Sequence, residues 1–210
     1  MTIYYFFDTY CGWCYGFDKA VSEFLDRMPD DLDICLVSGG LFTGDRVAPI
    51  SAYGHIKAAN QQIADVYGVT FGDAYNDLFD DDSQLMDSAH PASGLALFRP
   101  HLTGKEFVRF AIALQKAFYQ DGADLSKPDV YLTLAQAFGV ADKVSKEEVA
   151  QALADKTLAS ADFDFTAKCG IQSYPNFLLN KGDKWYDLRG QASSGEELFA
   201  NYQYLLELDK

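Results

Sequence analysis

Basic residues and histidines are scarce in this sequence of 210 residues, and each shortage excludes a class of protein. Lysine and arginine number 17 against 31 acidic residues, which gives a net charge of −14 at pH 7. A nucleic-acid-binding protein needs a basic face to displace counterions from phosphates, and an anionic membrane surface attracts the same charge. We therefore expect no nucleic-acid partner and no membrane partner. With three histidines in all, a histidine-rich metal site is not expected either.

Long apolar runs are also missing. No segment approaches the ~18 consecutive apolar residues that a membrane span requires. Met1 leads directly into an aromatic segment, and no lysine or arginine precedes Lys19, so the basic region of a secretory signal peptide is absent. If Met1 is the native start, the expected location is the cytoplasm. In that reducing compartment a pair of cysteines is more often catalytic or metal-binding than structural.

The hydrophobic pattern predicts an α/β fold that helices interrupt. At 49% hydrophobic and 15% aromatic residues, the chain can bury a substantial core. Its length, at roughly 150 residues per domain, allows one large domain or one domain with an insertion. The predicted strands cover residues 3–8, 32–38, 176–180 and 184–188, and a helix closed by Pro29 joins the first two. Between about residues 49 and 165 the patterns are almost entirely helical.

This order of elements predicts a small α/β unit made of residues 1–44 and 166–210, which an all-helical insertion over residues 45–165 interrupts. Capping signals mark several of the helices. Helices are predicted over residues 56–68, from Thr103 to Gln120 with a Thr103–Glu106 capping box, over 126–139 with Ser126 as cap, from Ser145 with Glu148 to about Ser160, and from Ser194 with Glu197 to about Leu208.

One short motif carries chemistry, Cys11-Gly12-Trp13-Cys14, at the junction of the first strand and the first helix. This spacing brings the two sulfurs onto adjacent positions of one helical turn, close enough to bridge. The N-terminus of a helix presents unpaired N–H groups and a partial positive charge, which favours the thiolate at Cys11. A thiolate is the nucleophile in disulfide exchange. Cys11 is therefore the expected nucleophile, and Cys14, one turn deeper, the resolving cysteine.

Two other interpretations of the pair are weaker. A structural zinc site needs two more ligands at suitable spacing, but Cys35 and Cys169 are single and no second pair exists. A structural disulfide across so short a loop removes little chain entropy. Cys35 alternates with apolar residues in its strand and is predicted to be a packed small hydrophobe. Cys169 precedes Pro175 by six residues and is either a structural residue or a second redox residue.

A second feature, Ser173-Tyr174-Pro175, directly precedes the predicted strand at residues 176–180. Proline is tolerated at the first residue of a strand, because it need not donate to the ladder there. Only about 5–6% of X–Pro bonds in folded proteins are cis, so the residues alone favour a trans bond.

These residues resemble the DsbA-like branch of the thioredoxin fold, and the resemblance spans essentially the whole chain. It is strongest to the cytoplasmic DsbA-type proteins related to FrnE and to 2-hydroxychromene-2-carboxylate isomerase. The specific string is Asp8-Thr9-Tyr10-Cys11-Gly12-Trp13-Cys14-Tyr15-Gly16-Phe17. Two further strings are suggestive, Ser38-Gly39-Gly40-Leu41-Phe42 and Asp87-Ser88-Ala89-His90-Pro91-Ala92.

The resemblance implies an α/β thioredoxin-like fold with a large all-helical insertion. It also implies a role for each matching position. Cys11 matches the nucleophile, Cys14 the resolving cysteine and Pro175 the cis-proline that faces the pair. The expected substrate-binding residues are Gly12, Trp13, Ser173 and Tyr174, since the backbone beside the cis-proline pairs with an extended substrate segment. Gly12 and Trp13 also hold the two positions that tune the redox poise.

Two positions depart from the family pattern. Trp13 replaces the histidine or proline common there, so neither an oxidising nor a reducing poise is assigned. Tyr5 occupies the place of the buried acidic residue of thioredoxin and DsbA. Asp8 is the candidate substitute as proton acceptor for Cys14. The alternative is that Asp8 is a strand-end residue that caps local N–H groups.

Three functions fit the sequence. The leading one is a thiol–disulfide oxidoreductase or isomerase for protein or peptide disulfides and thiols, with no cofactor beyond the cysteine pair, no metal, and glutathione as a candidate co-substrate. The second is a glutathione-dependent transferase or isomerase of the kappa or chromene-isomerase type. Those relatives carry serine in place of the leading cysteine, so the presence of both Cys11 and Cys14 favours dithiol chemistry. The third is a chaperone-like module whose helical insertion offers an apolar groove to unfolded chains.

Overall fold

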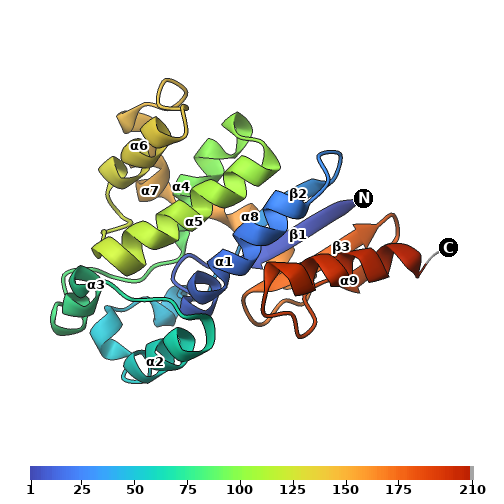
Figure 1. Cartoon of the computed structure of the whole chain (residues 1–210). Helices are drawn as coiled ribbons and strands as arrows, with labels where there is room; N and C mark the ends of the chain where they lie inside the picture. Colours follow the sequence, from blue (N-terminus) through green and yellow to red (C-terminus); the bar gives the residue numbers. More distant parts are fainter. Residues whose placement is uncertain (209–210) are drawn as a thin grey trace.

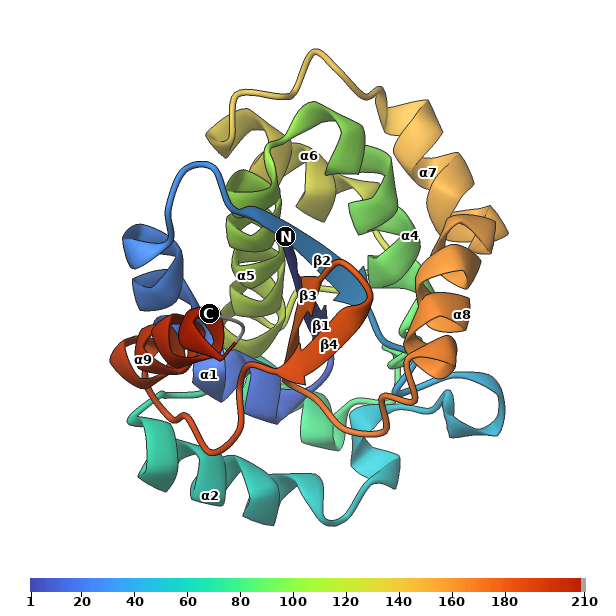
Figure 2. The same cartoon turned by 90° about the vertical axis from the view of Figure 1, so that its right-hand side faces the viewer.

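Four strands form one mixed sheet at the centre of the molecule (Figure 1 and Figure 2). The computed structural model describes residues 1–208. The strands are β1 (Thr2–Phe7), β2 (Asp33–Ser38), β3 (Asn176–Lys181) and β4 (Lys184–Asp187), in the spatial order β2-β1-β3-β4. β1 pairs in parallel with β2 and antiparallel with β3, and β3 pairs antiparallel with β4. All four predicted strands are confirmed, and β1 is a central strand.

Helices cover both faces of the sheet (Figure 2). On one face lie α1 (Gly12–Arg27) and α9 (Gly195–Glu207), which pack against each other. The rings of Phe17 and Phe24 on α1 contact Phe177 on β3, with centroids 6.2 and 6.4 Å apart. On the other face lies α8 (Ser160–Lys168), whose Phe165 ring is 5.4 Å from that of Tyr4 on β1. Successive residues of β1 therefore point to opposite faces of the sheet, one covered by α1 and α9 and the other by α8.

The chain between β2 and β3 is helical, as the sequence predicts. Its helices are α2 (Ile56–Tyr67), α3 (Asp73–Asp77), α4 (Ala89–Phe98), α5 (Gly104–Asp121), α6 (Pro128–Ala137) and α7 (Lys146–Asp155), followed by α8. α5 packs on both β2 and α1, and α2 packs on α1. The buried side chains of the sheet and of these helices form one continuous hydrophobic cluster. Within the described residues, no helix is both long enough and apolar enough to cross a membrane.

Several predicted helix ends are wrong. The helix that begins after Ser145 ends at Asp155 rather than near Ser160, because Lys156 takes a left-handed conformation with φ of 60°. Ser126 does not cap α6. Its hydroxyl donates to Asp124, and α6 begins at Pro128.

At the last helix, Ser194 accepts a hydrogen bond from the Glu197 amide as predicted, but the Glu197 carboxylate binds Ser193 instead of completing a capping box. The expected boundary between residues 165 and 166 falls inside α8. Residues 209 and 210 of the expected C-terminal segment lie outside the described residues.

The capping box at the start of α5 allows a test of how much a local sequence signal contributes to stability. The Thr103 hydroxyl accepts from the Glu106 amide, and the Glu106 carboxylate accepts from the Thr103 amide. Replacing Thr103 with alanine leaves an N-terminal amide without its partner, so we expect Thr103→Ala to lower the free energy of unfolding by about 1 kcal/mol in urea. The control is Thr133→Ala, an exposed position inside α6, which should change it by less than about 0.5 kcal/mol. Equal losses in both variants would contradict the capping argument.

Candidate active site

Cys11 and Cys14 lie at the start of α1, directly after β1. Cys11 is the N-cap residue, with extended backbone, and its carbonyl accepts from the amides of Cys14 and Tyr15 at 3.0 and 3.1 Å. Its own amide donates to the Asp8 carbonyl at 3.0 Å, which fixes the turn between β1 and α1. Both cysteines are free thiols. No acidic side chain occupies the first turn of α1, so the partial positive charge of the helix end is not neutralised there.

The two thiols differ in their surroundings. Cys14 is fully buried, whereas Cys11 retains 6% of its surface and lines a pocket. Burial raises the pKa of the Cys14 thiol well above its ordinary value. A side-chain hydrogen bond with Cys11 and electrostatic interaction with Cys11 raise that pKa further. The two cysteines therefore differ. The Cys11 sulfur borders a pocket, whereas the Cys14 thiol is buried and favours its protonated form.

Pro175 and Tyr174 face Cys11 from the start of β3. The Tyr174–Pro175 peptide bond is cis, and the Cys11 thiol donates to the Tyr174 carbonyl at 3.6 Å. Pro175 is buried, Tyr174 is half-buried, and Ser173 is exposed beside them. The structure thus places Tyr174 and Pro175 beside the cysteine motif, although the two segments lie far apart in the sequence.

The Tyr174 ring occupies a space that Gly39 leaves free. A Cβ atom on Gly39 would lie 2.3 Å from the ring. Burial raises the pKa of Tyr174 to about 12, while a hydrogen bond from the Gly40 amide lowers it. Gly39 therefore makes room for the Tyr174 side chain, and the Gly40 amide binds it.

Asp8 is buried at the end of β1 and has three hydrogen-bond donors. Its carboxylate accepts from the amides of Tyr10 and Leu41, each at 2.9 Å, and from the Ser88 hydroxyl. Burial raises the pKa of Asp8 to about 6, and these three hydrogen bonds oppose that rise. All three sequence strings behind the family resemblance therefore meet at this carboxylate. The contacts match the second interpretation of Asp8, a residue that caps local N–H groups.

Gly12 and Trp13, between the two cysteines, contact α2. A Cβ on Gly12 would lie 2.9 Å from the Ile63 side chain, so α2 approaches closely here. Trp13 is 38% exposed and meets the Tyr67 ring edge-on, with centroids 6.2 Å apart. Next to them is a pocket of about 150 Å³ with a mostly apolar lining. It is formed by residues 10–13, by several residues between Leu41 and Ile63, and by Tyr75, Met86 and Tyr119.

Two residues that contact the site are missing from the sequence analysis. Arg189 follows β4, and its Nη1 donates to the Pro175 carbonyl at 3.1 Å while its guanidinium lies 5.0 Å from the Phe17 ring centroid. Gln115 on α5 is fully buried, and its Nε2 donates to the carbonyls of Asp8 and Thr9, both at 3.2 Å. No local pattern marks either residue, because their partners lie far away in the sequence.

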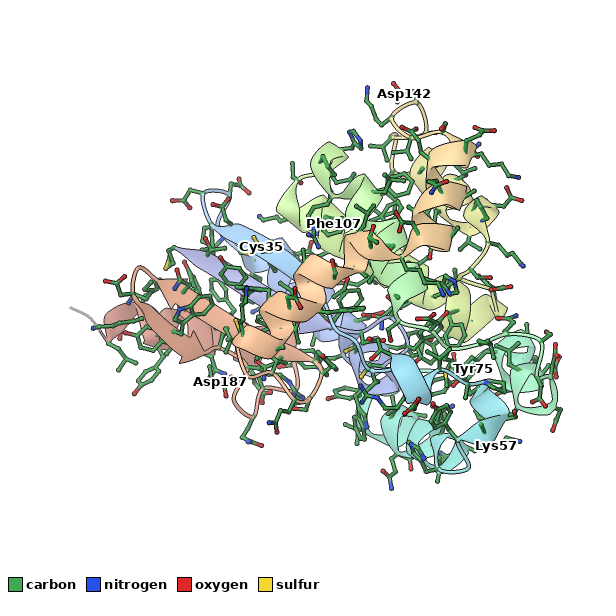
Figure 3. The ribbon with its side chains drawn as sticks, turned by 180° about the vertical axis from the view of Figure 1, so that it is seen from behind. Cys35, Lys57, Tyr75, Phe107, Asp142 and Asp187 are labelled. Carbon is green, nitrogen blue, oxygen red and sulfur yellow. The ribbon has the colours of Figure 1, made fainter. Side chains whose placement is uncertain are left out.

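The remaining cysteines lie elsewhere. Cys35 is exposed, which corrects the prediction of a packed residue. Its neighbours Ile34 and Leu36 are buried on one face of β2, so alternation turns Cys35 to the other face. There Cys35 and Phe107, both labelled in Figure 3, line a hollow of about 470 Å³ that does not include Cys11 or Cys14. Cys169 ends α8, within electrostatic reach of Tyr4. Across residues 1–208, no three His, Cys, Asp or Glu side chains gather in a way that suits a metal ion.

Comparison with solved structures shows which proteins share this arrangement. DsbM, a cytosolic disulfide reductase from Pseudomonas aeruginosa, matches with a TM-score of 0.76 and 25% identity, over 99% of this chain and 100% of that chain, and it has also been solved with glutathione. A candidate protein disulfide isomerase from Nitrosomonas europaea matches with a TM-score of 0.80 and 19% identity, over 100% and 98%. A 2-hydroxychromene-2-carboxylate isomerase reaches 0.58 at 12% identity, over 100% and 96%. No protein-family model and no curated protein sequence matches the chain.

The chain therefore has the DsbA-like thioredoxin fold with a helical insertion, as the sequence predicts. In fold it is similar to DsbA-like oxidoreductases, and the neighbours with the higher TM-scores are named for disulfide reduction or isomerisation.

The buried Asp8 carboxyl predicts how stability depends on pH. The folded protein holds this proton more tightly than the unfolded chain does, so its contribution to stability falls as pH rises from about 4 to 6. Over that range wild type should lose up to about 3 kcal/mol relative to Asp8→Asn, measured as the free energy of unfolding at each pH. The exposed Asp26, changed to asparagine, is the control. A wild-type curve parallel to that of Asp8→Asn would contradict the shifted pKa.

The glycine beside Tyr174 gives a second test. Because its new Cβ would overlap the Tyr174 ring, we expect Gly39→Ala to lower the free energy of unfolding by about 1–3 kcal/mol and to slow any reaction at Cys11. Gly54→Ala is a matched control, since a Cβ there meets no atom within 4 Å. If Gly39→Ala is as stable and reactive as Gly54→Ala, the Tyr174 ring does not depend on this space.

Proposed function

We propose that this protein is a thiol–disulfide oxidoreductase in which Cys11 attacks a substrate disulfide and Cys14 resolves the product. The observation that carries the proposal is the asymmetric pair at the start of α1, with the Cys11 sulfur 3.6 Å from the Tyr174 carbonyl beside Pro175. The N-terminus of α1 presents its partial positive charge to the Cys11 sulfur, and the thiolate is the nucleophile in disulfide exchange. The buried Cys14 is reached from Cys11 and not from the surface, which fits the resolving role.

The exchange proceeds in two balanced steps. The Cys11 thiolate attacks one sulfur of the substrate disulfide, forms a mixed disulfide and releases the first substrate thiolate. The Cys14 thiol then gives up its proton and attacks the Cys11 sulfur, so that the Cys11–Cys14 disulfide forms and the second substrate thiolate leaves. Two electrons pass from the protein pair to the substrate. The reverse sequence oxidises a substrate dithiol, and the direction depends on the potential of the partner couple.

Substrate binding is proposed at the backbone beside Pro175 and at the exposed ring of Trp13. An extended segment would pair with the main chain of Ser173 and Tyr174 by strand addition. The small pocket beside Cys11 would take an apolar side chain next to the reacting cysteine. The candidate substrates are protein or peptide disulfides and thiols.

Glutathione is the proposed small co-substrate. DsbM, to which this chain is similar, has been solved with glutathione. The proposed reaction needs no organic cofactor, because the cysteine pair itself carries the two electrons. A reducing compartment such as the cytoplasm is the proposed setting, in line with the printed description of DsbM as cytosolic.

A glutathione-dependent isomerase is the second candidate function. The fold match to a 2-hydroxychromene-2-carboxylate isomerase and the apolar pocket beside Cys11 favour it. In such an enzyme Cys14 would have no chemical step to perform, so the two functions make opposite predictions for Cys14. The chaperone-like alternative has less support, since the large exposed hydrophobic side chains are spread over separate elements.

Single cysteine variants test the proposed function. We expect Cys14→Ser to accumulate a mixed disulfide at Cys11 with a substrate peptide, because the resolving attack is lost. We expect Cys11→Ser to abolish reduction of insulin disulfides. Mass spectrometry of the trapped species and the insulin turbidity assay measure these outcomes. Cys35→Ser is the control and should keep full activity. Full glutathione-conjugating activity in a variant lacking both Cys11 and Cys14 would contradict the dithiol function.

A further inference from the structure

Two buried polar groups beneath the resolving cysteine have no partner. Asp18 follows Cys14 by four residues on α1 and is 4% exposed, and neither of its carboxylate oxygens has a hydrogen-bond partner among residues 1–208. Tyr5 on β1 is 1% exposed, and its hydroxyl is also without a partner in the same part of the chain. An unpaired carboxyl in a protein interior is costly. Packing alone does not explain an aspartate at this position.

Asp18 lies about one helical turn after Cys14 on α1, and both are buried. Residues four apart on a helix lie on one face, with Cβ atoms about 5–6 Å apart, a gap that a single water spans. Tyr5 stacks on Phe177 with centroids 4.3 Å apart, on the face of the sheet that α1 covers. Burial raises the pKa of Tyr5 well above its ordinary value, and the charges of Cys14 and Asp18 raise it further. The phenol of Tyr5 is thus within electrostatic reach of both groups.

Asp8, the other buried carboxyl near the pair, is less suited to receive a proton. Its oxygens already accept from two amides and the Ser88 hydroxyl, so fewer acceptor positions are left for a further proton. Asp18 has no such contacts to lose. Of the two carboxyls, Asp18 is the one with free acceptor positions.

We propose that Asp18 accepts the proton of the Cys14 thiol during the resolving step, a role that rests on the dithiol function proposed above. As the Cys14 S–H bond breaks, the proton passes to the Asp18 carboxylate, and the Cys14 thiolate attacks the Cys11 sulfur of the mixed disulfide. The Cys11–Cys14 bond forms, the bond from Cys11 to the substrate sulfur breaks, and the substrate leaves as a thiolate. Asp18 then returns the proton to water. In the reverse direction Asp18 donates it back to Cys14.

The charges around Asp18 support this exchange. Burial raises the pKa of Asp18 well above its ordinary value, and the positive charge of Lys116 on α5 opposes that rise. Burial also raises the pKa of Cys14. Other titratable groups also face this region. The charge of Asp8 raises the pKa of Cys14 further, and burial and the charge of Cys14 raise the pKa of Tyr119 on α5. Burial and the Asp18 charge raise the pKa of Tyr15, and the Arg189 charge opposes the rise at Tyr5. Because burial raises the pKa of Asp18, its carboxylate is a stronger base than an exposed one.

The test separates the two steps in one assay. A symmetric aromatic disulfide that releases a coloured thiolate reports the attack of Cys11 as a first release and the attack of Cys14 as a second. The full-length protein carries Cys35→Ser and Cys169→Ser, so that only the motif reacts. We expect Asp18→Asn to leave the first release within twofold of the parent and to slow the second at least about tenfold at pH 7, the lower end of general-base effects. Asp18→Glu should recover part of the second rate.

The matched control is Asp26→Asn, an exposed aspartate on the same helix, which should change neither release. Asp18→Asn should be no less stable than the parent in urea, because it removes an unpaired buried carboxyl. The pH profile of the parent protein is an independent readout that needs no variant. Its second release should reach a plateau once Asp18 is ionised, whereas in Asp18→Asn it should keep rising about tenfold per pH unit.

Each failure has a distinct signature. An unchanged second release in Asp18→Asn, or equal slowing of both releases, would overturn the role of Asp18 while the dithiol function stands. A parent profile that rises without a plateau would overturn it as well. If the parent gives no second release, or if Cys14→Ser still gives one, the proposed dithiol function itself fails.

Discussion

The buried carboxylate of Asp8 is the interaction on which the rest of the site depends. It accepts hydrogen bonds from Tyr10, Leu41 and Ser88, and so ties the end of β1 to the loop after β2 and to the helical insertion. A carboxyl is tolerated in such a place only when donors are held around it. The Asp8 carbonyl in turn accepts from the Cys11 amide, so the same anchor sets the first residue of α1. The position of the reactive sulfur therefore depends on how the insertion packs against the sheet.

The second constraint is the unequal burial of the two thiols. Cys11 lines a pocket and contacts the Tyr174 carbonyl, while Cys14 on α1 is fully buried. In the proposed exchange Cys11 attacks first, because it is the less buried of the two thiols. The cost is that the inner thiol must lose its proton in a dry environment, where the charged form is disfavoured. The unpartnered carboxyl of Asp18, one turn further along α1, is placed to meet that need.

Local patterns predicted much of this fold and part of its site. The four strands, the capping box at Thr103 and the place of the Cys11–Cys14 pair all depend on residues close together in the sequence. The pairing of Pro175 with Cys11 needed the family resemblance, because periodicity carries no information about contacts between distant segments. The sequence did not mark Asp18, because a polar residue on an amphipathic helix usually faces solvent. It did not mark Arg189, because the partner of Arg189, the Pro175 carbonyl, lies fourteen residues earlier in the chain. Cys35 was placed wrongly because both strand neighbours are apolar, although alternation turns it to the opposite face.

Equilibration of the purified protein with glutathione buffers of increasing oxidised fraction tests the central claim most directly. After acid quenching and alkylation of free thiols, mass spectrometry distinguishes the reduced pair, the Cys11–Cys14 disulfide and glutathione adducts. The account predicts a reversible two-electron transition in which Cys11 and Cys14 lose their thiols together, with little adduct at equilibrium. Stable glutathione on Cys11 with a free Cys14 thiol, at every buffer ratio, would contradict a dithiol mechanism.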